Sequence, residues 1–80
     1  MRVEVRLPQL SMGMSDAEIV QWYVAVGDSV EADQDIVEIE AEKATVTVPA
    51  PSAGTISSID AKPGDVIEVR DLLCVIEAGG

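Results

Sequence analysis

The residue in this sequence best placed for covalent chemistry is Lys43, whose primary amine lies in a stretch with no other positive charge. Acidic and apolar residues alternate before it, at positions 38–42, and apolar residues alternate with threonine after it, at positions 44–48. A lysine in a turn is usually a solvated charge, so a functional interpretation depends on the surrounding pattern. Lys62, the only other lysine, lacks a preceding acidic residue and a following alanine, and we interpret it as solvated surface.

The runs on both sides of Lys43 have the alternation of strands with one buried face. Residues 37–41 alternate apolar and acidic side chains, and residues 44–48 alternate again in the opposite sense. Glu42 and Lys43 would then form a tight reversal at a hairpin tip, with the amine pointing away from the body. Neither Asn-Gly nor Asp-Gly marks this turn, so its prediction depends on the alternation alone.

The composition removes most other kinds of active site. The chain has 80 residues, no histidine, and only one cysteine, one tyrosine and one tryptophan. A domain of this size buries a modest core and seldom forms a substrate pocket. General-base catalysis, nucleophilic triads and zinc binding use side chains that are missing or scarce here. We therefore expect no catalytic residue, no metal site and no enzyme activity for the domain alone.

The charge of the chain limits its partners. Its net charge is −10 with a pI near 4.1, and acidic residues occur in every segment. This distribution argues against nucleic acid and membranes as partners, because both require basic patches, and favours proteins with basic or mixed surfaces. Cys74 lies alone in an apolar run, which predicts a small buried hydrophobe in a reducing compartment. Without a signal peptide or a membrane-spanning run, we expect a soluble intracellular domain.

An internal repeat divides the chain into two halves. A shift of 37 positions places residues 26–41 over residues 63–78, so that Gly27-Asp28 matches Gly64-Asp65. Units this short cannot bury an apolar face alone, so the halves should pack on each other. We predict an all-β fold, a flattened barrel or sandwich of two four-stranded antiparallel sheets with pseudo-twofold symmetry. The predicted strands lie at residues 3–7, 19–24, 30–32, 36–41, 45–48, 55–59, 66–69 and 72–77.

The residues around Lys43 also carry a resemblance to a known family. The pattern is a lysine between an acidic residue and an alanine, after an acidic-apolar strand and between two spaced glycines; here it comprises Glu40, Glu42, Lys43, Ala44, Gly27 and Gly54. With Pro8 and the stretch at residues 18–28, it extends over residues 3–77. The chain thus resembles the biotinyl/lipoyl attachment domain, and within it the lipoyl domain of 2-oxo acid dehydrogenase complex acyltransferases.

The resemblance implies that Lys43 carries lipoic acid in an amide linkage and works as a swinging arm, passing acyl groups between active sites. Glu40, Glu42 and Ala44 are implied to serve recognition; carboxylates beside an ammonium stabilise its charged form and so do not activate it. The implied partners are a lipoate ligase or lipoyl transferase, a 2-oxo acid dehydrogenase, the acyltransferase core and dihydrolipoamide dehydrogenase. The loop at residues 9–17 is implied to lie near Lys43 and to help a partner enzyme choose its domain.

Two alternatives remain open at this point. Biotin attachment uses the same hairpin and the same amide linkage, but its lysine is normally flanked by methionines, where this chain has Glu42 and Ala44. An unmodified protein-interaction module is the other alternative, and it predicts that Lys43→Ala keeps its function. Met12 and Met14, in the loop, could contact a partner or act as flexible filler. Trp22 is expected to fill the core.

The expected organisation is one lipoyl domain at residues 1–77, with half-repeats at about 3–41 and 44–78, followed by the start of a flexible linker at residues 78–80. Such a domain would be part of a dihydrolipoamide acyltransferase and monomeric when isolated. We expect it in the cytoplasm, or in the mitochondrial matrix of a eukaryotic cell.

Overall fold

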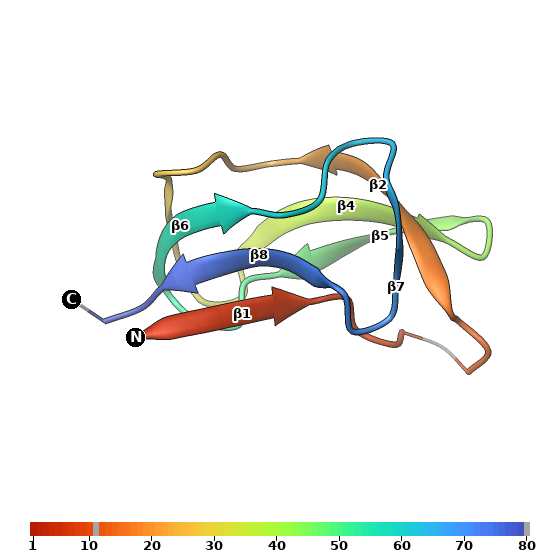
Figure 1. Ribbon diagram of the computed structural model, residues 1–80, viewed down its shortest axis with the longest axis horizontal. Helices are drawn as coiled ribbons and strands as arrows, with labels where there is room; N and C mark the ends of the chain where they lie inside the picture. Colours follow the sequence, from red (N-terminus) through yellow and green to blue (C-terminus); the bar gives the residue numbers. More distant parts are fainter. Residues whose placement is uncertain (11, 80) are drawn as a thin grey trace.

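The computed structural model describes residues 1–10 and 12–79, and strands dominate it. Its strands are β1 Arg2–Arg6, β2 Asp16–Trp22, β3 Ser29–Val30, β4 Asp35–Ala41, β5 Ala44–Pro49, β6 Gly54–Ile59, β7 Val66–Glu68 and β8 Leu72–Glu77. They form two four-stranded antiparallel sheets, with the orders β1-β8-β6-β3 and β5-β4-β2-β7 (Figure 1). The predicted all-β fold is therefore confirmed. Within the described residues there is no helix of the length and hydropathy needed to cross a membrane.

The core lies between the two sheets and is centred on the inner strands. Ile19 on β2, Ile39 on β4, Ile56 on β6 and Ile76 on β8 are each at most 1% exposed. Removing these branched side chains from water is the main favourable contribution to folding. Trp22 packs against this core but is only partly buried, and its indole Nε1 donates a hydrogen bond to the carbonyl oxygen of Ala61 at 2.9 Å.

The predicted two-fold relation between the halves appears in the hydrogen bonds at the glycine turns. In each turn, the glycine nitrogen donates to the carbonyl oxygen of a core isoleucine in the other half of the chain. The nitrogen of that isoleucine in turn donates to the carbonyl oxygen of the aspartate that follows the glycine. The four bonds measure 2.8–2.9 Å and join Gly27 and Asp28 to Ile56, and Gly64 and Asp65 to Ile19. Gly27 and Gly64 have φ angles of 96° and 92°, which glycine adopts without a steric cost. The halves therefore exchange equivalent contacts.

The two halves differ in the connection that follows the first strand. Leu7 and Ala50 occupy equivalent places, since their nitrogens donate to the carbonyls of Asp71 and Gln34, residues related by the repeat. Eleven residues then separate Leu7 from Ile19, whereas five separate Ala50 from Ile56. The longer β1–β2 connection lies towards the same end of the molecule as the β4–β5 hairpin (Figure 1).

Strand boundaries differ from the predicted ones mainly at β2, which spans Asp16–Trp22 and not residues 19–24. The early start comes from pairing with β7, where Asp16 lies opposite Glu68 and Glu18 opposite Val66. The alternation of one segment cannot reveal this pairing, because the neighbouring strand comes from the other half of the chain. Ala78, which the sequence assigns to a linker, is buried, and its nitrogen bonds the Met1 carbonyl at 2.7 Å. Gly80 lies outside the described residues, so the linker stays a prediction.

Candidate functional site

Lys43 lies at the tip of the β4–β5 hairpin, at the end of the molecule opposite the two chain termini (Figure 1). Ala41 and Ala44 form the last pair of the ladder, so Glu42 and Lys43 are the two central residues of the turn. Both side chains are exposed. The lysine is thus neither buried nor inside a strand, and its amine is open to a second protein.

The turn at Glu42-Lys43 has a left-handed backbone. The φ angles are 52° for Glu42 and 68° for Lys43, the combination of a type I′ hairpin turn. A residue with a Cβ costs about 1–2 kcal/mol in this conformation, and Asn-Gly is the usual choice. The repeat relates Glu42 to Gly79, where a glycine adopts a similar φ of 77°. The first half thus accepts strain where the second half uses glycine, and such strain concentrates at functional sites.

One side of the hairpin borders an open groove rich in carboxylates, which we call the acidic groove. Glu18 on β2 lies directly opposite Glu40 on β4, an arrangement that is unfavourable for two like charges. The groove encloses about 330 Å³, and its lining residues are Asp16, Ala17, Glu18, Glu40, Ala41, Glu42, Lys43 and Val66. Lys43 is the single cation of this lining, so a partner that approaches its amine meets four carboxylates.

A second hollow lies beside the tip of the hairpin, and we call it the apolar notch. It encloses about 190 Å³ and is lined by Leu10, Met14, Ala41, Glu42, Ala44 and Val46. The loop supplies the first two of these residues, and the Leu10 nitrogen lies 3.4 Å from the Met14 sulfur as a donor. Met14 is 4% exposed and packs in the core, whereas Met12 is 96% exposed and lies on the surface.

The structure brings the predicted site residues together around the tip. Glu40 and Glu42 line the acidic groove, and Ala44 lines the apolar notch. Lys62 is exposed at another turn, where its backbone nitrogen donates a hydrogen bond to the Asp65 carboxylate at 2.9 Å. Leu10 belongs to the loop at residues 9–17, which the resemblance implied to lie near Lys43, whereas sequence reasoning missed Glu18 as a neighbour of the site. The β2–β4 register, which pairs Glu18 with Glu40, places Glu18 there.

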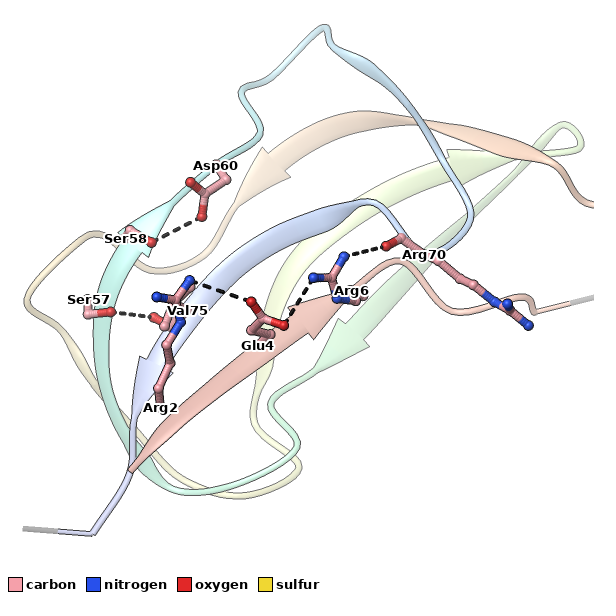
Figure 2. Close-up of polar contacts among 8 residues, drawn as sticks. All are labelled: Arg2, Glu4, Arg6, Ser57, Ser58, Asp60, Arg70 and Val75. Carbon is pink, nitrogen blue, oxygen red and sulfur yellow. Dashed lines mark hydrogen bonds and ion pairs between the residues drawn. The ribbon is translucent and has the colours of Figure 1, made fainter.

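Other groups with chemical potential lie away from the tip. The arginines cluster near β1: Arg6 bonds the Arg70 carbonyl at 2.9 Å and, with Arg2, pairs with Glu4 (Figure 2). Burial, with a smaller contribution from the Asp60 charge, raises the pKa of the Cys74 thiol to about 11, so this thiol is a poor nucleophile at neutral pH. Among residues 1–10 and 12–79, no cluster of three or more His, Cys, Asp or Glu side chains suits a metal ion.

The tip has the geometry of a covalent attachment site. An exposed primary amine on a two-residue turn can accept an acyl group without any rearrangement of the fold. Lipoic acid and biotin both fit such an amine, because each is linked through its carboxyl group and needs no enclosing pocket. The Cys74 thiol is too deeply buried to assist such a reaction.

Comparison with curated proteins gives relatives along nearly the whole chain. It is 42% identical over 79 residues to the dihydrolipoyllysine-residue succinyltransferase component of the 2-oxoglutarate dehydrogenase complex of Bartonella vinsonii subsp. berkhoffii. It is 40% identical over 76 residues to the lipoamide acyltransferase component of the branched-chain α-keto acid dehydrogenase complex of Pseudomonas aeruginosa. These matches cover 99% and 95% of this chain but only 19% and 18% of the relatives, so the chain spans about a fifth of their length.

Solved structures share the fold. The lipoyl domain of the 2-oxoglutarate dehydrogenase complex of Azotobacter vinelandii matches with a TM-score of 0.80 and 28% identity, covering 98% of this chain and 99% of that domain. Urea carboxylase of Kluyveromyces lactis matches with a TM-score of 0.83 and 30% identity, covering 96% of this chain and 6% of the enzyme. A family model described as biotin-requiring enzyme matches residues 3–77. The chain therefore belongs to the biotin/lipoyl attachment family.

Proposed function

We propose that this chain is a lipoyl carrier domain in which Lys43 is joined to lipoic acid by an amide bond. The observation that carries the proposal is the exposed Lys43 at the strained hairpin tip, between Glu42 and Ala44. The 42% identity to a succinyltransferase component of a 2-oxo acid dehydrogenase complex supports lipoic acid over biotin. The domain would belong to a dihydrolipoamide acyltransferase and would itself be monomeric. We assign it to the cytoplasm, or to the mitochondrial matrix if the source is eukaryotic.

Attachment requires little from the domain beyond a presented amine. The Nζ of Lys43 attacks the carboxyl carbon of a lipoyl donor that a ligase has activated. The new amide bond forms as the bond to the activating group breaks, and the nitrogen gives up two of the three ammonium protons to a base and keeps the third as the amide N–H. The partner enzyme supplies the base and the activated donor, and the hairpin supplies a fixed approach for the nitrogen.

The geometry of the tip suits a carrier. Lys43 would hold the lipoyl group, whose dithiolane would supply the capacity to accept an acyl group together with two electrons. Lys43 lies at one end of a domain whose longest dimension is 38 Å, with the chain termini at the other end, so a tether at the termini leaves the amine free to reach separate sites. Tethering replaces diffusion of the intermediate by a high local concentration. A 2-oxo acid dehydrogenase, the acyltransferase core and dihydrolipoamide dehydrogenase would then be visited in turn.

We assign recognition of the ligase and the dehydrogenase partly to the acidic groove. Four carboxylates around one lysine attract a basic surface and speed its approach. Glu42→Gln should therefore slow lipoylation, with a matched control in Glu31→Gln, which removes an exposed carboxylate outside the groove. The groove role also predicts that added salt slows lipoylation of the wild-type domain more than that of Glu42→Gln. An unchanged rate in Glu42→Gln would defeat the recognition role.

The function is tested by mass measurement on the intact domain. The domain is incubated with lipoate ligase, ATP and lipoate, and separately with biotin protein ligase, ATP and biotin. We expect the addition of one lipoyl group, followed by reductive acylation when a matching 2-oxo acid dehydrogenase and its substrate are added. A mass gain only with biotin would establish the biotin alternative, which the description of the matching family also names. No gain with either ligase would favour an unmodified interaction module.

A further inference from the structure

The apolar notch is a feature that a solvent-exposed attachment lysine does not by itself require. Of its six lining residues, only Glu42 is charged, and its wall includes the side chains of Leu10, Met14 and Val46. Leu10 is 45% exposed, although it lies close to the buried Met14. The notch therefore leaves apolar surface open to water within one residue of Lys43, on either side of the turn.

The notch is built by the part of the chain that breaks the symmetry of the fold. The connection between Leu7 and Ile19 is longer than its counterpart between Ala50 and Ile56, and the additional length supplies Leu10 and Met14. Met14 is buried in the core cluster, and its sulfur accepts a hydrogen bond from the Leu10 nitrogen within the loop. The extra residues thus create an apolar surface at the end that carries the lysine.

Size and charge restrict what can occupy the notch. Its volume of about 190 Å³ is similar to that of an apolar cavity of about 150 Å³ that binds benzene, so it suits a small ring with a short piece of chain and not a folded partner. A second copy of the chain would bring one net charge of −10 against another, which opposes close approach. An anionic ligand would be repelled by the carboxylate of Glu42 in the wall of the notch. An uncharged, apolar and slender occupant fits these conditions.

We propose that the notch binds the dithiolane ring and the adjoining methylene groups of the lipoyl group on Lys43, so that the arm folds back and alternates between a docked and a free state. This proposal rests on the proposed lipoylation of Lys43. Glu42 and Ala44, the two neighbours of Lys43, form part of the wall, so the arm begins at the rim of the notch. A short tether gives an effective concentration on the order of millimolar, so an intrinsic dissociation constant near 1 mM would keep the arm docked about half the time.

Docking would withdraw the dithiolane from solution without preventing transfer. At about half occupancy, the freely accessible fraction falls about twofold, a cost that a partner enzyme overcomes by binding the free arm. Residues of the notch would therefore protect the ring against small reductants between visits to the active sites. Leu10, the one exposed large apolar side chain of the wall, is the residue whose truncation opens the notch with least damage to the core.

The test compares ¹³C methyl spectra of the unmodified and the lipoylated domain, after intact mass has shown complete loading. We expect shifts of the Met14, Leu10 and Val46 methyl signals with a lipoyl or octanoyl arm, and none with an acetyl arm, which is too short to enter. Reduction of the ring by a water-soluble phosphine should be about twofold faster in Leu10→Ser than in the wild-type domain. The control Val26→Ser, which removes an exposed apolar side chain outside the notch, should leave the reduction rate unchanged.

The outcomes separate this inference from the proposed function. Complete lipoylation without methyl shifts at the notch, and with equal reduction rates in Leu10→Ser and wild type, would overturn docking while leaving the carrier role intact. If the ligase adds nothing, the carrier role fails. Docking is then tested on Lys62→Arg protein acylated with an activated lipoyl ester, with the same methyl shifts as the deciding result.

Discussion

Replacement of Gly54 by alanine should destabilise the domain through a steric collision between β6 and β8, the two inner strands of one sheet. A Cβ at this position would lie 2.6 Å from Cγ2 of Ile76 and still closer to the carbonyl oxygen of Glu77. Both residues belong to β8, an inner strand that pairs with β1 as well as β6, so it cannot move aside without loss elsewhere. Overpacking of this kind typically costs 1–3 kcal/mol, and the backbone obstacle places Gly54→Ala near the upper end, at about 3 kcal/mol.

The assay is urea and thermal unfolding followed by the fluorescence of Trp22, the only tryptophan. A loss of about 3 kcal/mol corresponds to a fall in Tm of roughly 12–24 °C for a domain of this size. The matched control is Gly64→Ala, where the Cβ meets open space but φ is 92°, so only the backbone conformation is penalised, by about 1–2 kcal/mol. The steric reasoning is refuted if Gly54→Ala unfolds within about 0.5 kcal/mol of the wild type, or is more stable than Gly64→Ala.

Three further predictions concern other parts of the fold. Trp22→Phe removes the indole N–H that donates to the Ala61 carbonyl oxygen at 2.9 Å. Urea titrations should show a loss of about 1–3 kcal/mol in the free energy of unfolding. A smaller loss would mean that water replaces the donor. Burial, with a smaller contribution from the Asp60 charge, raises the pKa of Cys74 from 9.0 to about 11. The unfolded chain therefore loses the thiol proton at lower pH than the folded chain, and stability should fall as the pH rises from 9 to 11. The urea midpoint of Cys74→Ala should fall less over this range, and an equal fall would contradict the raised pKa of Cys74. Glu42→Asn should be more stable than Glu42→Gln by about 0.5–1 kcal/mol, because asparagine tolerates positive φ; equal urea midpoints would show that the turn is not strained.

Much of the fold could be predicted because its determinants are local or repeated. Alternation of apolar and polar residues marked the strands on both sides of Lys43, and the glycine pair at Gly27 and Gly64 revealed the repeat. Two halves that share a pattern and cannot fold alone must pack on each other, which leads directly to two related sheets. The position of Lys43 between the strands followed from the same alternation.

Features that depend on pairing between distant segments could not be predicted. The extension of β2 to Asp16 requires β7, and the opposition of Glu18 and Glu40 requires the β2–β4 register. The left-handed turn was also hidden, because Glu42 and Lys43 are not residues that such turns favour. Its geometry is imposed by the tight pairing of the strands on both sides and not by the preferences of the turn residues.

The most direct test of the carrier role locates the added group in the chain. Peptide mass analysis of the domain after treatment with lipoate ligase should find the lipoyl group on Lys43 alone. Lys43→Arg should abolish the addition, and Lys62→Arg should leave it unchanged. A lipoyl group on Lys62 or on the terminal amine, or full modification of Lys43→Arg, would contradict the central claim that the hairpin tip is the site of attachment.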